Sequence, residues 1–155
     1  MKFQRTGDSP LSQAALVYRP EEYSFVVEPK PESGVASLLL DDLQLEIDLQ
    51  GHLLYPWGLC SHTTWRPMTA IPPRYVQGSV SAGIEREITP GISWRLPHPG
   101  RWLVFVNRQA GWVCVGDPLA KDGSEAIEFS PGCVIVLSRD QPVALWLRPN
   151  TLPSR

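Results

Sequence analysis

The chain lacks the features that define several large classes of protein. Its three cysteines are an odd number without C-x-x-C spacing, which argues against a disulfide framework and against a paired-cysteine zinc site. No apolar run approaches the roughly 18 residues that a membrane helix needs. No apolar signal segment follows the N-terminal residues. We therefore expect a cytoplasmic protein with no membrane partner.

An excess of one charge sign is also missing. The 155 residues carry a net charge of −2, which gives no general attraction to nucleic acid and makes nucleic acid a disfavoured partner. The charges are nevertheless unevenly spread, because residues 1–60 hold nine acids against four bases, whereas residues 61–115 hold six arginines against two glutamates. This distribution favours acidic and basic strands that lie beside each other and pair, over an arginine-bearing face for an anionic partner.

Helical periodicity is almost absent, and short apolar runs occupy its place. Most of them are bounded by Gly, Pro, Asn or Asp, and each has the length of a strand. The runs are Leu43–Leu49, Arg101–Asn107, Trp112–Val115, Cys133–Leu137 and Val143–Leu147. Sixteen prolines, about twice the usual share, are tolerated at turns and sheet edges but not inside helices. The sequence predicts an all-β, mostly antiparallel fold with little helix, either a β-sandwich or a partly closed β-barrel built from hairpins.

The length fits one domain with a sizeable core. The polar residues 1–13 are expected to form a flexible N-terminal arm, residues 14–149 a single β-rich domain, and residues 150–155 a C-terminal tail. Two prolines and a Ser-Gly pair make 29–34 the best candidate for a linker within this domain.

Three hairpins are predicted inside the domain. The first begins with leucines and an isoleucine that alternate with Gln44, Glu46 and Asp48, a period of two that indicates one buried face and one solvated face. Gln50-Gly51 supplies its turn, because glycine adopts the positive φ that a tight turn requires. The other two hairpins join Trp102–Val106 to Trp112–Val115, and Val134–Leu137 to Val143–Leu147.

The stretch 56–73 differs from the rest of the chain. It contains four prolines and two tryptophans without steady periodicity, and it is too long for an ordinary connection. Aromatic and arginine side chains cluster along it and at its ends, and these residue types anchor protein interfaces. The candidate binding residues are Tyr55, Trp57, Trp65, Arg66, Arg74 and Tyr75. The same stretch is equally compatible with a structural lid whose tryptophans plug one end of the core.

Evidence for catalysis or metal binding is weak. Cys60 and His62 are two residues apart, and Asp117 could orient the imidazole, but a nucleophilic cysteine and its base are usually distant in sequence. These three residues are retained as weak catalytic candidates. His52 and His98 would complete a set of zinc ligands with Cys60 and His62, but the set lacks paired spacing. We predict no metal and no cofactor.

Two functions remain. The pattern favours a non-enzymatic β-domain that binds another protein through the aromatic and arginine-bearing loop, and the composition matches that of small bacterial accessory or immunity proteins. A homodimer through an exposed edge strand is compatible with this reading. The alternative is a small-ligand-binding or hydrolytic β-barrel with Cys60 and His62 at its mouth.

Overall fold

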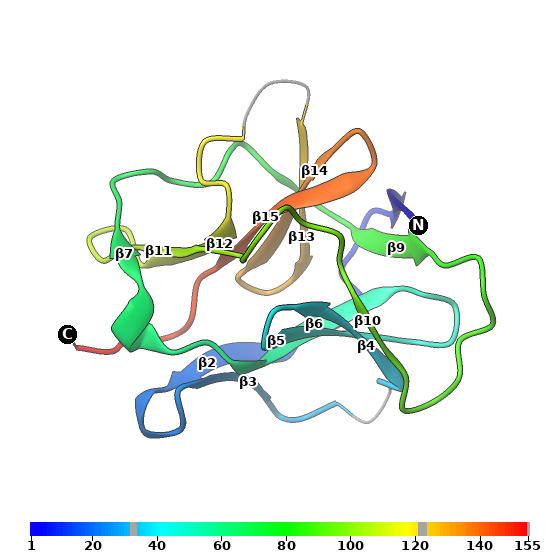
Figure 1. Ribbon diagram of the computed structural model, residues 1–155, viewed down its shortest axis with the longest axis horizontal. Helices are drawn as coiled ribbons and strands as arrows, with labels where there is room; N and C mark the ends of the chain where they lie inside the picture. The colour runs from blue at the N-terminus through cyan, green and yellow to red at the C-terminus, as the bar shows by residue number, and fades with distance from the viewer. Residues whose placement is uncertain (32–33, 121–123, 155) are drawn as a thin grey trace.

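The fold is a β-sandwich of two facing sheets with a small additional ribbon (Figure 1). A computed structural model describes residues 1–31, 34–120 and 124–154. In these ranges the only helical elements are two short 3-10 turns, η1 (Pro20–Glu22) and η2 (His62–Thr64). The predicted all-β fold is confirmed, and the sheets form a sandwich and not a closed barrel.

The first sheet has six strands in the order β10-β4-β5-β6-β3-β2. The strands are β2 (Ala15–Arg19), β3 (Ser24–Glu28), β4 (Ala36–Leu40), β5 (Leu43–Ile47), β6 (Leu53–Leu59) and β10 (Ser93–Arg95). Neighbours are antiparallel except β10 and β4, which run parallel. The predicted hairpin around Gly51 is confirmed as β5–β6, and Gly51 has a φ of +83°.

The second sheet has seven strands in the order β7-β11-β12-β15-β14-β13-β8. The strands are β7 (Arg66–Pro67), β8 (Val76–Gln77), β11 (Val104–Asn107), β12 (Trp112–Gly116), β13 (Ser124–Ser130), β14 (Cys133–Ser138) and β15 (Gln141–Leu147). The predicted hairpins β11–β12 and β14–β15 are both confirmed. Arg139 and Asp140 both have positive φ, as a two-residue hairpin turn demands.

Part of the stretch expected to be a flexible arm is a strand. β1 (Lys2–Gly7) pairs antiparallel with β9 (Ser79–Gly83) in a two-stranded ribbon. Phe3 is 1 % exposed, and its N–H donates to the Asp140 carbonyl oxygen. Phe3 is the one buried side chain of β1, so the polar sequence of this strand shows no alternation that would predict it.

The segment predicted as a linker connects β3 to β4, and its residues 32 and 33 lie outside the described ranges. β4 and β13 lie outside the predicted strands, and both complete hairpins with strands that were predicted, β5 and β14.

The main core lies between the inner faces of the two sheets. Leu38 and Leu45 from the first sheet and Ile135 and Leu145 from the second are almost fully buried there. A second apolar cluster lies on the outer face of the seven-stranded sheet, and it includes Trp112 and Trp146. The sandwich therefore has buried apolar side chains in two layers.

Residues 68–75, which we name the strap, cover this second cluster. β7 and β8 lie at opposite edges of the seven-stranded sheet, so the chain between them must cross its outer face. Met68 and Ala70 pack against the cluster, and the Ala70 carbonyl oxygen accepts a hydrogen bond from Asn107 Nδ2 at 2.9 Å. Residues 68–73 of the stretch 56–73 therefore serve as a cover for the sheet, whereas residues 56–59, which were predicted as loop, belong to β6.

Candidate functional site

The outer face of the six-stranded sheet carries mainly apolar side chains, and some of them are exposed to solvent. Side chains alternate between the two faces of a strand, so the register places Trp57 of β6 beside Gln44 of β5, and Leu39 of β4 beside Gln44 on its other side. On β2 and β3, Val17 pairs with Val26. We name this surface the Trp57 face; its members are Val17, Val26, Leu39, Gln44, Glu46, Tyr55, Trp57 and Leu59.

Trp57 lies near the middle of this face and is held there by a carboxylate. Its Nε1–H donates to Glu46 Oε1 at 2.8 Å, and Ser37 Oγ donates to the same oxygen at 2.6 Å. The indole is 37 % exposed, and because its N–H is already bonded, the ring presents mainly apolar surface to solvent. Glu46 was expected to lie on a simply solvated face, but it is half-buried and links three strands.

Two open grooves flank Trp57. One, of about 680 Å³, is lined by Val26, Lys30, Glu46 and Tyr55 among others. The second groove, of about 610 Å³, lies toward the turn between β4 and β5. Tyr55 is 5 % exposed, and burial raises the pKa of its hydroxyl.

The other predicted binding residues lie elsewhere. Trp65 is 8 % exposed and packs in the main core, 4.9 Å from the ring of Tyr18. Arg66 lies on β7 at one end of the sandwich, and Arg74 is exposed on the strap. Tyr75, also on the strap, meets Trp112 edge to face at 6.3 Å. Of the six predicted residues, the structure therefore brings only Tyr55 and Trp57 together on the Trp57 face.

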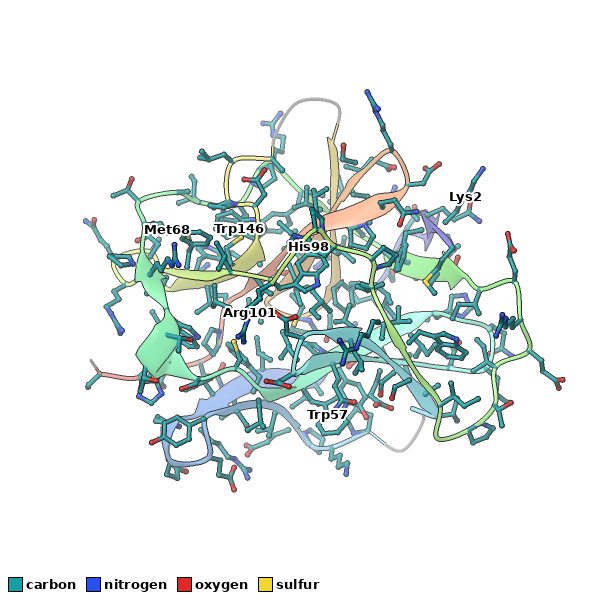
Figure 2. The ribbon with its side chains drawn as sticks, in the orientation of Figure 1. Lys2, Trp57, Met68, His98, Arg101 and Trp146 are labelled. Carbon is teal, nitrogen blue, oxygen red and sulfur yellow. The ribbon has the colours of Figure 1, made fainter. Side chains whose placement is uncertain are left out.

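Figure 2 shows that Trp57 and Met68 of the strap lie on different sides of the sandwich. Trp57 extends from the outer side of the six-stranded sheet, at the bottom of the view, whereas Met68 and Trp146 lie on the other sheet. The six predicted binding residues are close in sequence, but the chain passes from the six-stranded sheet to the seven-stranded sheet between Leu59 and Arg66.

The catalytic candidates have environments that disfavour a nucleophile. Burial raises the pKa of the Cys60 thiol to about 11, and the nearby Trp65 indole opposes this rise only in part. The thiol is therefore protonated at neutral pH, whereas a nucleophilic cysteine needs its thiolate. His62 directs Nδ1 to the Tyr18 hydroxyl at 3.2 Å and stacks on Tyr23, with ring centroids 5.5 Å apart. Asp117 lies at the end of β12 and accepts a hydrogen bond from the Leu119 N–H.

Cys60 does line a groove at the end of the sandwich, which we name the end groove. This groove has a volume of about 570 Å³ and a lining of mixed polar and apolar character, and its charged residues are Asp41, Asp42, Arg66 and Arg101. His62 is not among the residues that line it. The end groove is thus the place where a ligand of the alternative function would bind, without an imidazole directed into it.

The three histidines make separate contacts. His52 Nδ1 lies 3.0 Å from Asp48 Oδ2 at the β5–β6 turn, and His98 stacks on Trp102 with centroids 3.9 Å apart. Within the described ranges, no three or more His, Cys, Asp or Glu side chains are grouped so that they could hold a metal ion.

No protein-family model, curated protein or solved structure matches this chain. In the part of the chain that the structure describes, no helix has the length and apolar character needed to cross a membrane. Function must therefore be inferred from the surface of this molecule itself.

Proposed function

We propose that this protein binds another protein through the Trp57 face. The observation that supports this proposal is the difference in exposure of large apolar side chains between the two outer faces of the sandwich. The strap covers one of them, so that Trp112 and Trp146 are only 6 % and 1 % exposed. On the other, Trp57 is 37 % and Leu59 is 55 % exposed.

The make-up of the Trp57 face supports a protein partner more than a small ligand. Protein interfaces have a central aromatic anchor surrounded by weaker contacts and a polar rim. Trp57 is such an anchor, and Gln44, Glu46 and Lys30 lie around it. A small ligand is normally enclosed over most of its surface, whereas the grooves beside Trp57 are open.

The hydrolytic alternative has less support. It requires Cys60 to react with substrate in the end groove, and the raised pKa of this thiol keeps it protonated at neutral pH.

All three cysteines are buried and unpaired, which agrees with a reducing compartment such as the cytoplasm.

Site-specific photocrosslinking tests the proposal. A benzoylphenylalanine at position 57 is irradiated in lysate of the native host, and the same group at position 119 serves as the control. Leu119 is 72 % exposed and follows β12 of the other sheet, so it reports on contacts unrelated to the Trp57 face. We expect one stoichiometric product from position 57 alone, identified by mass spectrometry.

The identified partner is then purified and titrated against wild type and Trp57→Ala. A central tryptophan anchor contributes about 2 kcal/mol or more, so the affinity should fall by about 30-fold. Equal affinity for the two forms, or the same products from both crosslinker positions, would remove the proposal. A product containing two copies of this chain would replace it with a homodimer.

A further inference from the structure

We infer that the partner presents basic side chains to the Trp57 face, and that an arginine or lysine enters the groove between Trp57 and the β4–β5 turn. This inference rests on the proposed function and names the chemistry of its partner. We name this 610 Å³ space the acidic groove, because its charged lining residues are Glu22, Asp41 and Asp42. No lysine or arginine of the described residues lines it.

The fold brings these acids together from separate parts of the sequence. Leu43, the first residue of β5, pairs with Gly58, which places the β4–β5 turn with Asp41 and Asp42 at the end of β6. On the other side of β6, Leu59 pairs with Ser24, which places η1 and Glu22 at the same end. The two acidic segments therefore flank the last residues of β6.

Neighbouring arginines neutralise these carboxylates only in part. Arg19 lies 3.6 Å from Glu22 and 2.6 Å from Glu28, so one cation is shared between two acids. Asp41 Oδ2 accepts a hydrogen bond from the backbone N–H of Trp102 at 2.8 Å. The acidic groove consequently keeps a net negative charge.

The end groove on the other side of the β4–β5 turn has a different charge. Arg66 and Arg101 line it together with Asp41 and Asp42, yet none of the ion pairs within 4.0 Å among the described residues joins either arginine to either aspartate. Asp42 makes neither an ion pair nor a side-chain hydrogen bond with another described residue, and it is exposed. It is therefore available to a cation that enters the acidic groove.

The apolar part of the acidic groove suits the stem of a basic side chain. Val26, Leu39 and Leu59 line it beside the Trp57 ring. Arginine and lysine bury their methylene stems on apolar surface while the charged head stays near solvent and carboxylates. Tryptophan is also the best aromatic partner for a cation. Apolar floor, aromatic ring and acidic rim together match a basic side chain better than a purely apolar one.

A peptide titration tests the inference. The probe is a fluorescein-labelled nonapeptide of alternating arginine and leucine, and its glutamate–leucine counterpart serves as the opposite-charge control. Binding is followed by fluorescence anisotropy at low salt for wild type, Trp57→Ala and the double variant Glu22→Gln/Asp42→Asn. Asp41 is left intact because it bonds the Trp102 N–H.

The matched control is Glu85→Gln/Glu87→Gln. This pair removes the same charge from two exposed acids that do not line either groove at the β4–β5 turn. We expect the arginine peptide to bind wild type and the control within about twofold of each other, and to bind Glu22→Gln/Asp42→Asn and Trp57→Ala at least about tenfold more weakly. The glutamate peptide should not bind.

Four results would overturn the inference: no binding of the arginine peptide to wild type, full affinity in Glu22→Gln/Asp42→Asn, full affinity in Trp57→Ala, or an equal loss in the control. The proposed function is judged separately by crosslinking from position 57. If that crosslink forms and the partner's affinity depends on Trp57 but not on the two acids, the proposed function stands and the inference about charge fails.

Discussion

At the scale of single residues, two tryptophans of one sequence stretch differ in environment. Trp65 is 8 % exposed in the main core, whereas Trp57 is 37 % exposed and makes one hydrogen bond to Glu46. We expect Trp65→Ala to lower the free energy of unfolding by about 3–5 kcal/mol. Trp57→Ala should lower it by about 1 kcal/mol, because Glu46 keeps its bond from Ser37.

Urea denaturation of both variants checks this difference. It also establishes that Trp57→Ala is folded for the binding experiments. Similar losses in the two variants would contradict the assigned environments.

We expect the stability of the folded state to decline at alkaline pH, because it contains buried titratable groups. Burial raises the pKa of Cys60 from 9.0 to about 11 and that of Tyr18 from 10.0 to about 12. The folded state holds these protons more tightly than the unfolded state, so the stabilisation is complete below the unfolded pKa and is lost as the pH rises through the folded pKa. The melting temperature should therefore fall from about pH 9 upward, as thermal unfolding monitored by circular dichroism would show.

Thiol titration gives an independent check. At pH 8 the native protein should react slowly with Ellman's reagent, and all three thiols should react once guanidinium has unfolded the chain. Rapid reaction of Cys60 in the native protein would contradict the assigned pKa and restore this residue as a nucleophile.

At the scale of strands, Glu46 joins three elements of the six-stranded sheet. Glu46→Lys removes the acceptor of Ser37 on β4 and of Trp57 on β6, and we expect a loss of about 1–3 kcal/mol in the free energy of unfolding. Glu46→Gln keeps an acceptor oxygen and should lose less. The matched control is Gln44→Lys. Gln44 lies on the same face of β5, and its side chain makes no hydrogen bond in the described structure. Chemical denaturation in which Glu46→Lys and Gln44→Lys behave alike would show that the network contributes nothing.

This network also shows how far local sequence patterns predict structure. Alternation along β5 correctly placed Glu46 on the outer face, but its partners come from β4, which no pattern indicated, and from a residue assigned to a loop. The hairpins β5–β6, β11–β12 and β14–β15 were predictable because periodicity and turn residues are local signals. Two-residue strands such as β7 and β8 exist only through tertiary pairing, so no local signal marks them.

The candidate site follows the same division. Tyr55 and Trp57 were identified from residue type, because large aromatic side chains near arginines suggest an interface. Glu22 carried no signal, because its place beside Asp42 depends on strand order, which a single sequence does not reveal. Trp65, Arg74 and Tyr75 were grouped with the site by proximity along the chain, yet the chain carries them into the core and across the other sheet.

At the scale of the whole molecule, we expect that cleavage of the strap at one position will expose the apolar cluster beneath it. A specific-protease site inserted after Ile71, which is 58 % exposed, would allow cleavage of the folded protein. Cleavage should expose the cluster around Trp112 and Trp146, shift tryptophan fluorescence to longer wavelength, increase binding of a hydrophobic dye, and lower the melting temperature by several degrees. The uncut insertion variant is the control, and identical spectra before and after cleavage would show that the strap does not seal the cluster.

The two ends of the strap have a consequence for how the protein behaves at high concentration. β7 pairs with the outer side of β11, and β8 pairs with the outer side of β13. Each edge of the sheet therefore exposes only two residues of strand backbone to another chain. A long unpaired strand at a sheet border is a template on which other chains polymerise, and short borders are a natural defence against it. One continuous segment thus shields both edges of the larger sheet, and we expect cleavage within it to increase aggregation at high protein concentration.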